Sequence, residues 1–227
     1  MQVFVVWHWV RRTICRWRVC PDGTWRHLVY TLKVPTCDDL TALYEWHKGR
    51  MAFGLWYVPV PDEPAYYCQK LREQFCNILA PNYERVFHIT VFVVGFCGAD
   101  DFGQVDLAEQ IKALARLNLP PFELSFSSLG TFDNSLHIKI NPHFVFDDIR
   151  QTLSATHQEI SPAVYVPHIT LGFYQDNYPM ADILDIIQTN QVAPKTFLVD
   201  KLIFGTYVPT QPQGKLSCEY QLLLSGV

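Results

Sequence analysis

The sequence predicts an α+β protein with a bilobal fold, in which two similar lobes are related by a pseudo-twofold repeat. Three observations lead to this prediction. Hydrophobic residues make up 49% of the 227 residues and charged residues 18%, so the chain can build a substantial core. The order strand–helix–strand–helix–strand occurs twice with no long linker, and each copy contains a nearly identical tetrapeptide. We therefore expect antiparallel sheets lining a central cleft, with the helices outside.

The first 50 residues differ from the rest and are expected to form a separate, β-rich extension. Strand composition covers three stretches, 2–9, 13–20 and 25–34, and the turn signal Pro21-Asp22-Gly23 predicts that they form an antiparallel meander. A short helix is expected at 38–48. This segment has eight Lys or Arg against four Asp or Glu, a net charge of +4, and the remaining chain has −8. Such a basic segment is either a solvated surface or an arm that binds RNA and delivers the substrate. The predicted domains are 1–50 and 51–227.

From residue 51 onward, strand and helix patterns alternate. Runs of β-branched and aromatic residues mark the strands, and apolar residues at three- and four-residue spacing mark the helices. The expected strands are 52–60, 86–96, 122–129, 135–141, 164–174, 196–207 and 215–224. The expected helices are 64–79, 106–117, 145–157 and 180–189.

Cysteine content and charge limit the class of protein. The seven cysteines are odd in number and form no C-x-x-C pair, which favours reduced thiols in a cytoplasmic compartment, or a nuclear one if the source is eukaryotic. No apolar run approaches the ~20 residues that a membrane span needs. The net charge of −4 argues against a protein that coats long nucleic acid, but it is compatible with a nucleotide or a short RNA end as the ligand.

Two nearly identical motifs stand at corresponding places in the two halves. They are His88-Ile89-Thr90-Val91 and His168-Ile169-Thr170-Leu171, and each lies in a strong strand pattern. Side chains alternate between the faces of a strand, so the His and Thr of each motif point the same way. If the lobes face each other, two imidazoles and two hydroxyls meet in the cleft.

This set of side chains suits the cleavage of a phosphodiester without a metal. One histidine can take a proton from the incoming oxygen and the other can give one to the leaving oxygen, since both titrate near neutral pH. Threonine hydroxyls can donate hydrogen bonds to the phosphate oxygens. A zinc site would need further ligands, and the spacing of His137 and His143 does not suggest them. A Gly-x-Ser-x-Gly nucleophile motif is absent.

At this point the sequence resembles the 2H phosphoesterase superfamily, whose signature is a pair of His-x-Thr/Ser motifs. Supporting features are Pro167 before the second motif, Gly130-Thr131-Phe132 after a strand, and Tyr220 in the closing stretch. The run Leu55-Trp56-Tyr57-Val58-Pro59 is similar to the start of cyclic phosphodiesterases, whereas the second half looks more like 2′-5′ RNA ligase-like proteins. The resemblance covers roughly residues 51–227.

The resemblance implies a metal-independent hydrolase of 2′,3′-cyclic or ADP-ribose cyclic phosphodiesters, in nucleotides or at RNA ends. His88 and His168 would exchange protons with water and the leaving ribose oxygen, and Thr90 and Thr170 would hold the phosphate. No cofactor is implied. Two alternatives stay open: a 2′-5′ phosphodiesterase or RNA 2′-5′ ligase acting on oligonucleotides, and a non-catalytic nucleotide- or RNA-binding module. We expect a monomer with no membrane association and no obligate protein partner.

Three aromatic residues are candidates for binding the base or another part of the substrate. The resemblance places Trp56 where an aromatic ring stacks on a base, although a core tryptophan is an equal alternative. Tyr174 shares a face with His168 and Thr170 by alternation, and Tyr207 lies in the closing strand. Lys139 lies two residues after His137 and could meet phosphate, but we expect that strand to be a solvated edge.

Overall fold

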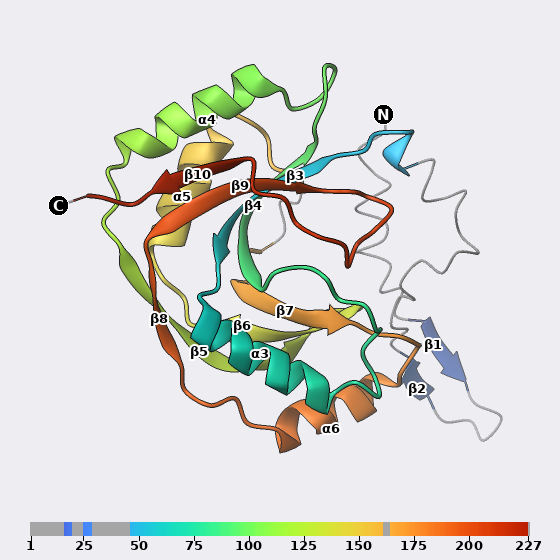
Figure 1. Ribbon diagram of the computed structural model, residues 1–227. Coiled ribbons are helices and arrows are strands. Elements are labelled where there is room, and N and C mark those ends of the chain that lie inside the picture. The colour runs from blue at the N-terminus through green and yellow to red at the C-terminus, as the bar shows by residue number, and fades with distance from the viewer. Residues whose placement is uncertain (1–15, 20–24, 29–45, 161–163, 227) are drawn as a thin grey trace.

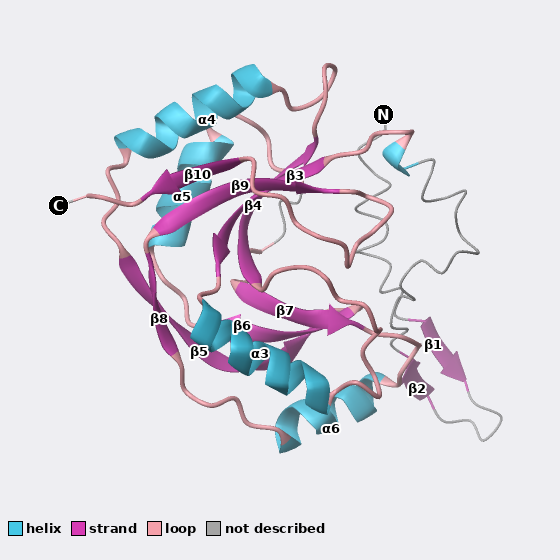
Figure 2. Ribbon diagram, viewed as in Figure 1, coloured by secondary structure: helices cyan, strands magenta, loops and turns pink. Residues whose placement is uncertain are grey.

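The computed structural model describes residues 16–19, 25–28, 46–160 and 164–226, and within them the fold is α+β with an antiparallel sheet, as predicted (Figure 2). Eight strands form this sheet, in the order β10-β9-β3-β4-β7-β6-β5-β8. Their bounds are β3 (Phe53–Pro59), β4 (His88–Phe96), β5 (Phe122–Thr131), β6 (Ser135–Ile140), β7 (His168–Phe173), β8 (Thr196–Val199), β9 (Lys201–Tyr207) and β10 (Tyr220–Leu223).

The sheet consists of two four-stranded halves that meet between β4 and β7 near the centre of the molecule (Figure 1). A single residue pair, Ile89 with Ile169, joins these two strands, whereas every other neighbouring pair of strands shares four or more. The two motifs therefore lie at the junction of the halves. A pseudo-twofold relation between the halves and a central cleft stay predictions.

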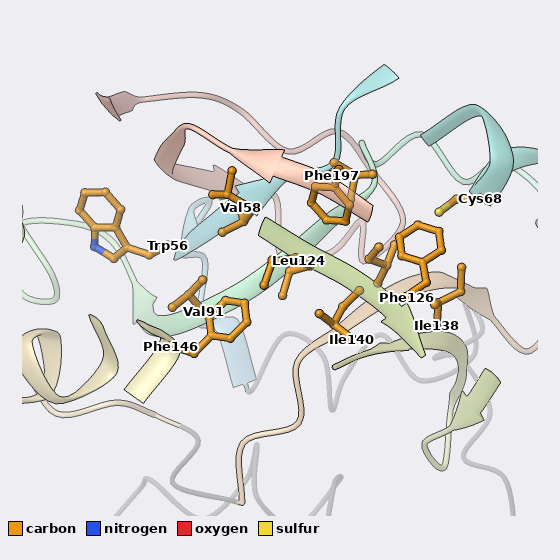
Figure 3. Packing of buried hydrophobic residues seen from close by; sticks show 14 of the residues in the cluster. Trp56, Val58, Cys68, Val91, Leu124, Phe126, Ile138, Ile140, Phe146 and Phe197 are labelled. Atoms are coloured by element: carbon orange, nitrogen blue, oxygen red, sulfur yellow. The ribbon is translucent and has the colours of Figure 1, made fainter. Parts of the chain in front are cut away.

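The helices of the described chain cover the sheet face that carries the two isoleucines. They are α3 (Asp62–Gln74), α4 (Gln104–Arg116), α5 (Val145–Ser154) and α6 (Met180–Thr189). Helix α3 packs on β7, α5 on β4 and α6 on β5, while α4 packs on α5. The core between the layers contains Ile89 and Ile169 together with Trp56, Val58 and Phe146 (Figure 3). Burial of this apolar face leaves the opposite face of β4 and β7 for the histidines and threonines.

Several elements differ from the sequence-based expectation. The single strand expected at 196–207 is two strands, β8 and β9, which pair with β5 and with β3 in different halves of the sheet. Helix α3 ends at Gln74 rather than at 79, because Leu79 forms a β-bridge with Tyr174. Strand β7 begins at His168 rather than at 164. In the described residues before His168, the pairing with β6 continues through one hydrogen bond, in which the Pro167 carbonyl accepts from the Ile140 N–H at 2.9 Å.

The N-terminal segment contributes a separate two-stranded sheet. Strand β1 (Arg16–Val19) pairs antiparallel with β2 (Trp25–Leu28), in agreement with part of the predicted meander. The rest of that meander and most of the helix expected at 38–48 fall outside the described residues. The division into domains 1–50 and 51–227 stays a prediction.

Candidate active site

The strand register brings the two His-Ile-Thr motifs together. Because Ile89 pairs with Ile169 in antiparallel strands, His88 lies opposite Thr170, and Thr90 lies opposite His168. Both isoleucines are fully buried in the core, so the four polar side chains share the other face of the sheet. His88 is buried, and the other three are partly buried. The predicted grouping of these four residues thus agrees with the strand pairing.

The backbone holds both imidazoles in the same way. Nδ1 of His88 lies 2.8 Å from the carbonyl oxygen of Val86, and Nδ1 of His168 lies 2.7 Å from that of Val166. A carbonyl can only accept, so Nδ1 carries the hydrogen in each ring. This arrangement fixes the tautomer and leaves Nε2 of each histidine to gain or lose a proton.

Burial disfavours the charged form of both histidines. It lowers the pKa of His88 to about 4, with further lowering by the charges of Arg85 and His168, against which the Val86 hydrogen bond acts. Burial also lowers the pKa of His168, and the Val166 hydrogen bond opposes that effect. Both rings are therefore neutral near pH 7 in the free protein. The charge of Arg85 lowers the pKa of His88 but is not among the causes that shift the pKa of His168.

Two tyrosines form hydrogen bonds across the junction of β4 and β7, each to the opposite motif strand. Tyr165, in the segment before β7, donates to the carbonyl oxygen of Thr90 on β4 at 2.9 Å. Tyr83, in the segment before β4, donates to the carbonyl oxygen of Thr170 on β7 at 3.2 Å. Burial raises the pKa of both phenols, that of Tyr83 to about 12, so each hydroxyl keeps its proton and can donate. Each motif strand is thus held by the segment that leads into the other.

An ion pair binds the backbone of β4 after Ile89, the residue at which β4 pairs with β7. Arg150 and Glu159 are joined at 2.5 Å with side chains mostly buried. Arg150 donates to the Val91 carbonyl at 2.6 Å, and Glu159 accepts from the Val93 N–H at 3.1 Å. These side chains satisfy backbone groups that β7 does not reach. The position of Thr90 therefore depends on Tyr165 and on this ion pair.

Two of the predicted aromatic contacts lie in the core instead. Trp56 is fully buried and its Nε1 donates to Gln110 on α4 at 2.7 Å, so neither ring face is open to a base. Strand β3 alternates regularly here, with Trp56 and Val58 in the main core and Leu55 and Tyr57 on the other face, where Tyr57 contacts the His88 ring edge-on at 5.4 Å. Tyr174 is also fully buried, beyond the end of β7, with its hydroxyl 2.7 Å from Oγ1 of Thr131.

The third predicted aromatic residue, Tyr207, contacts Arg85, a cation close to His88 that was not among the predicted site residues. The guanidinium of Arg85 stacks 4.0 Å from the centre of the partly buried Tyr207 ring. Arg85 Nε donates to the Gly214 carbonyl at 3.4 Å, while Nη2 is buried without a hydrogen-bond partner. A cation three residues before His88 was the only available signal, and it becomes meaningful once the loop is folded beside β9.

A third histidine, His137 on β6, also lies at the site. Its ring centre is 5.1 Å from that of His168, and Phe132 stacks on it at 4.2 Å. Strand β6 lies between β7 and β5, so the expectation of a solvated edge strand was wrong. His143 packs instead on Phe122. Across the described ranges, no group of three or more His, Cys, Asp or Glu side chains could hold a metal ion.

Comparison with known proteins agrees with the predicted resemblance. The family model of the 2′-5′ RNA ligase superfamily matches residues 60–209. The chain belongs to this superfamily. Membership of this superfamily of 2H phosphoesterases indicates an enzyme that acts on phosphodiester bonds. No curated protein matches the sequence.

Solved structures share the fold at low identity. The structure of TT0787 from Thermus thermophilus matches with a TM-score of 0.53 and 14% identity, over 77% of this chain and 98% of that one. The structure of E. coli LigT complexed with 3′-AMP matches with a TM-score of 0.53 and 13% identity, over 78% and 99%. Within the described part of the chain, every helix is too short or too polar to span a membrane.

Proposed function

We propose that this protein hydrolyses 2′,3′-cyclic phosphodiesters of nucleotides or RNA ends, or the related cyclic phosphate of ADP-ribose, without a metal. The observation behind this proposal is the paired arrangement of His88 and His168. Each ring is fixed through Nδ1 to a carbonyl two residues earlier, which leaves Nε2 of each ring for proton transfer, and the pairing of β4 with β7 puts both rings on one face of the sheet. Two such groups can act as base and acid in one displacement.

The proposed step begins with water attacking phosphorus. Nε2 of His88 takes the water proton as the new P–O bond forms, and the bond from phosphorus to one ribose oxygen breaks. His168, protonated when the anionic phosphate is bound, gives its proton to that leaving oxygen. The product is a phosphomonoester beside a free ribose hydroxyl. We assign the base to His88 because Arg85 disfavours its protonated form.

Thr90 and Thr170 are proposed to hold the phosphate. Each lies opposite a histidine on the same sheet face, so their hydroxyls can donate to oxygens that become more negative during the displacement. The tyrosines bonded to their carbonyls keep these donors in place. Tyr207, stacked with Arg85 beside His88, is a further candidate for contact with the substrate.

Hydrolysis of a panel of 2′,3′-cyclic nucleotides in EDTA tests the proposal. We expect turnover by the parent, and a loss of roughly 100-fold or more in His88→Ala and in His168→Ala, on the usual contribution of general acid–base catalysis. His143→Ala, which removes a histidine packed on Phe122, is the matched control and should keep the parent's rate. No turnover by a folded parent, or a rate insensitive to either substitution, would contradict the proposal.

A second candidate is cleavage or ligation of a 2′-5′ linkage, which the match to the 2′-5′ RNA ligase superfamily favours. The same pair of histidines could run the reaction backward, from a cyclic phosphate and a 5′-hydroxyl. LigT, which shares the fold, has been crystallised with 3′-AMP, a phosphomonoester of the kind that hydrolysis releases. Incubation of RNA halves that yields a joined product would favour ligation. Nucleotide affinity without any product would favour a binding module.

A further inference from the structure

Strand β6 continues the polar face of the active site beyond β7. Its side chains alternate between Ser135, His137 and Lys139 on one face and three buried aliphatic residues, Leu136, Ile138 and Ile140, on the other. Lys139 pairs in register with His168, and His137 pairs with Thr170. The proposed catalytic residues of β7 therefore have a cation and a further imidazole as their neighbours on β6.

Neither of these β6 side chains is used by the proposed hydrolysis. Lys139 is exposed, and no described residue forms an ion pair or hydrogen bond with its ammonium group. His137 is only 1% exposed, yet both of its ring nitrogens lack a hydrogen-bond partner. A buried polar group without a partner is destabilising, and such groups commonly have a functional explanation.

A glycine on the next strand creates the space in which both side chains lie. Gly130 on β5 pairs with His137, and a Cβ atom at Gly130 would come within 2.5 Å of His137 Nε2 and 2.6 Å of Lys139 Cε. The stem of Lys139 therefore lies beside Nε2 of His137, above a position without a side chain. If Lys139 turned toward an anion, it would uncover that nitrogen. Phe132 closes the other side, stacked on His137 and edge-on to His168.

We propose that Lys139 and His137 form a second phosphate subsite, which binds the phosphate next to the one that is cleaved. The proposal rests on the proposed function, because the scissile phosphate must lie over His168 and Thr170. Lys139 is one strand away, a spacing of ~4.8 Å, so its flexible stem can reach an anion beside that phosphate. In a nucleotide chain this anion is the 5′-phosphate of the same nucleoside. The preferred substrate is then an RNA end rather than a mononucleoside cyclic phosphate.

Binding of two nucleotides in EDTA tests the subsite without requiring turnover. Adenosine 3′-monophosphate and adenosine 3′,5′-bisphosphate are titrated into the full chain by calorimetry. The parent should bind the bisphosphate about tenfold more tightly, the range expected of one charge-assisted contact. Lys139→Met, which keeps the stem and removes the charge, should reduce that preference to about twofold. Lys139→Arg should restore most of it, and Lys112→Met, on the exposed surface of α4, should leave it unchanged.

Turnover separates failure of this subsite from failure of the proposed function. Hydrolysis of adenosine 2′,3′-cyclic phosphate, with no advantage from an added 5′-phosphate in binding or in kcat/KM, would overturn the subsite alone. A bisphosphate preference that depends on Lys139, with no hydrolysis of either cyclic nucleotide, would overturn the proposed function alone. Equal weakening of both nucleotides by Lys139→Met would also overturn the subsite, because Lys139 would then act on the scissile phosphate.

Discussion

Removal of the Tyr165 hydroxyl tests whether the reciprocal tyrosines set the geometry of the active site. Tyr165→Phe deletes one oxygen and leaves the carbonyl of Thr90 without the donor that now lies 2.9 Å away. Tyr83→Phe does the same to Thr170, where the distance is 3.2 Å. The ring and its packing stay in both variants, so each substitution removes little besides a hydrogen bond.

The expected cost follows from the partial burial of these bonds. A net hydrogen bond contributes about 1 kcal/mol, and the lost donor to a partly buried carbonyl adds to this, so each variant should lower the free energy of unfolding by about 1–2 kcal/mol. The two bonds cross the same junction, which only one residue pair otherwise joins. The double variant should therefore deviate from additivity by at least about 0.5 kcal/mol.

Urea unfolding and steady-state kinetics measure the two consequences. Misplacement of a catalytic group by about 1 Å can cost roughly 100-fold in rate, so we expect kcat to fall about tenfold or more in each variant while KM changes little. Tyr66→Phe, at an exposed tyrosine of α3, is the control for loss of a phenol. A loss of stability with an unchanged kcat would refute the positioning role of these tyrosines.

Three further predictions concern the surroundings of the site. Arg85→Met removes a charge that lowers the pKa of His88, so this pKa should rise from about 4, and the acidic limb of the kcat/KM profile should move to higher pH. An acidic limb that stays in place or moves to lower pH would contradict the assignment of His88 as base. Arg150→Met leaves the carboxylate of Glu159 buried beside β4 without its ion-pair partner, so the free energy of unfolding in urea should fall by about 3 kcal/mol. An unchanged unfolding midpoint would argue against a stabilising role for the Arg150–Glu159 ion pair. Trp56→Phe should lower stability in the same assay without raising KM for a cyclic nucleotide, because Trp56 lies in the core; a raised KM would indicate stacking on the base.

The sequence predicted which side chains share a face of each motif strand because the relevant rule is local. The two-residue period of a strand puts His88 and Thr90 on one face, whatever lies around them, and the same holds for His168 and Thr170. The helix at 180–189 was also placed at its observed bounds, since its apolar period is uninterrupted.

Features that depend on strand order or on how the sheet packs were not predictable in this way. Trp56 and Tyr57 point to opposite faces of β3, and the packing of the helices decides that Trp56 is the one in the main core. The interior place of β6, which turns His137 and Lys139 into neighbours of His168, follows from pairing with β5 and β7 rather than from its own residues. The bonds of Tyr83 and Tyr165 join segments about 80 residues apart, and a phenol in a loop gives no local signal of such a contact.

The pH dependence of kcat/KM for a 2′,3′-cyclic nucleotide in EDTA tests whether His88 and His168 act as base and acid. The parent should give a bell-shaped profile, because the proposed reaction needs His88 unprotonated and His168 protonated. The residual activity of His88→Ala should lose the acidic limb, and that of His168→Ala should lose the alkaline limb. Loss of the same limb in both variants, or a parent profile without two limbs, would contradict the assignment of opposite roles to the two histidines.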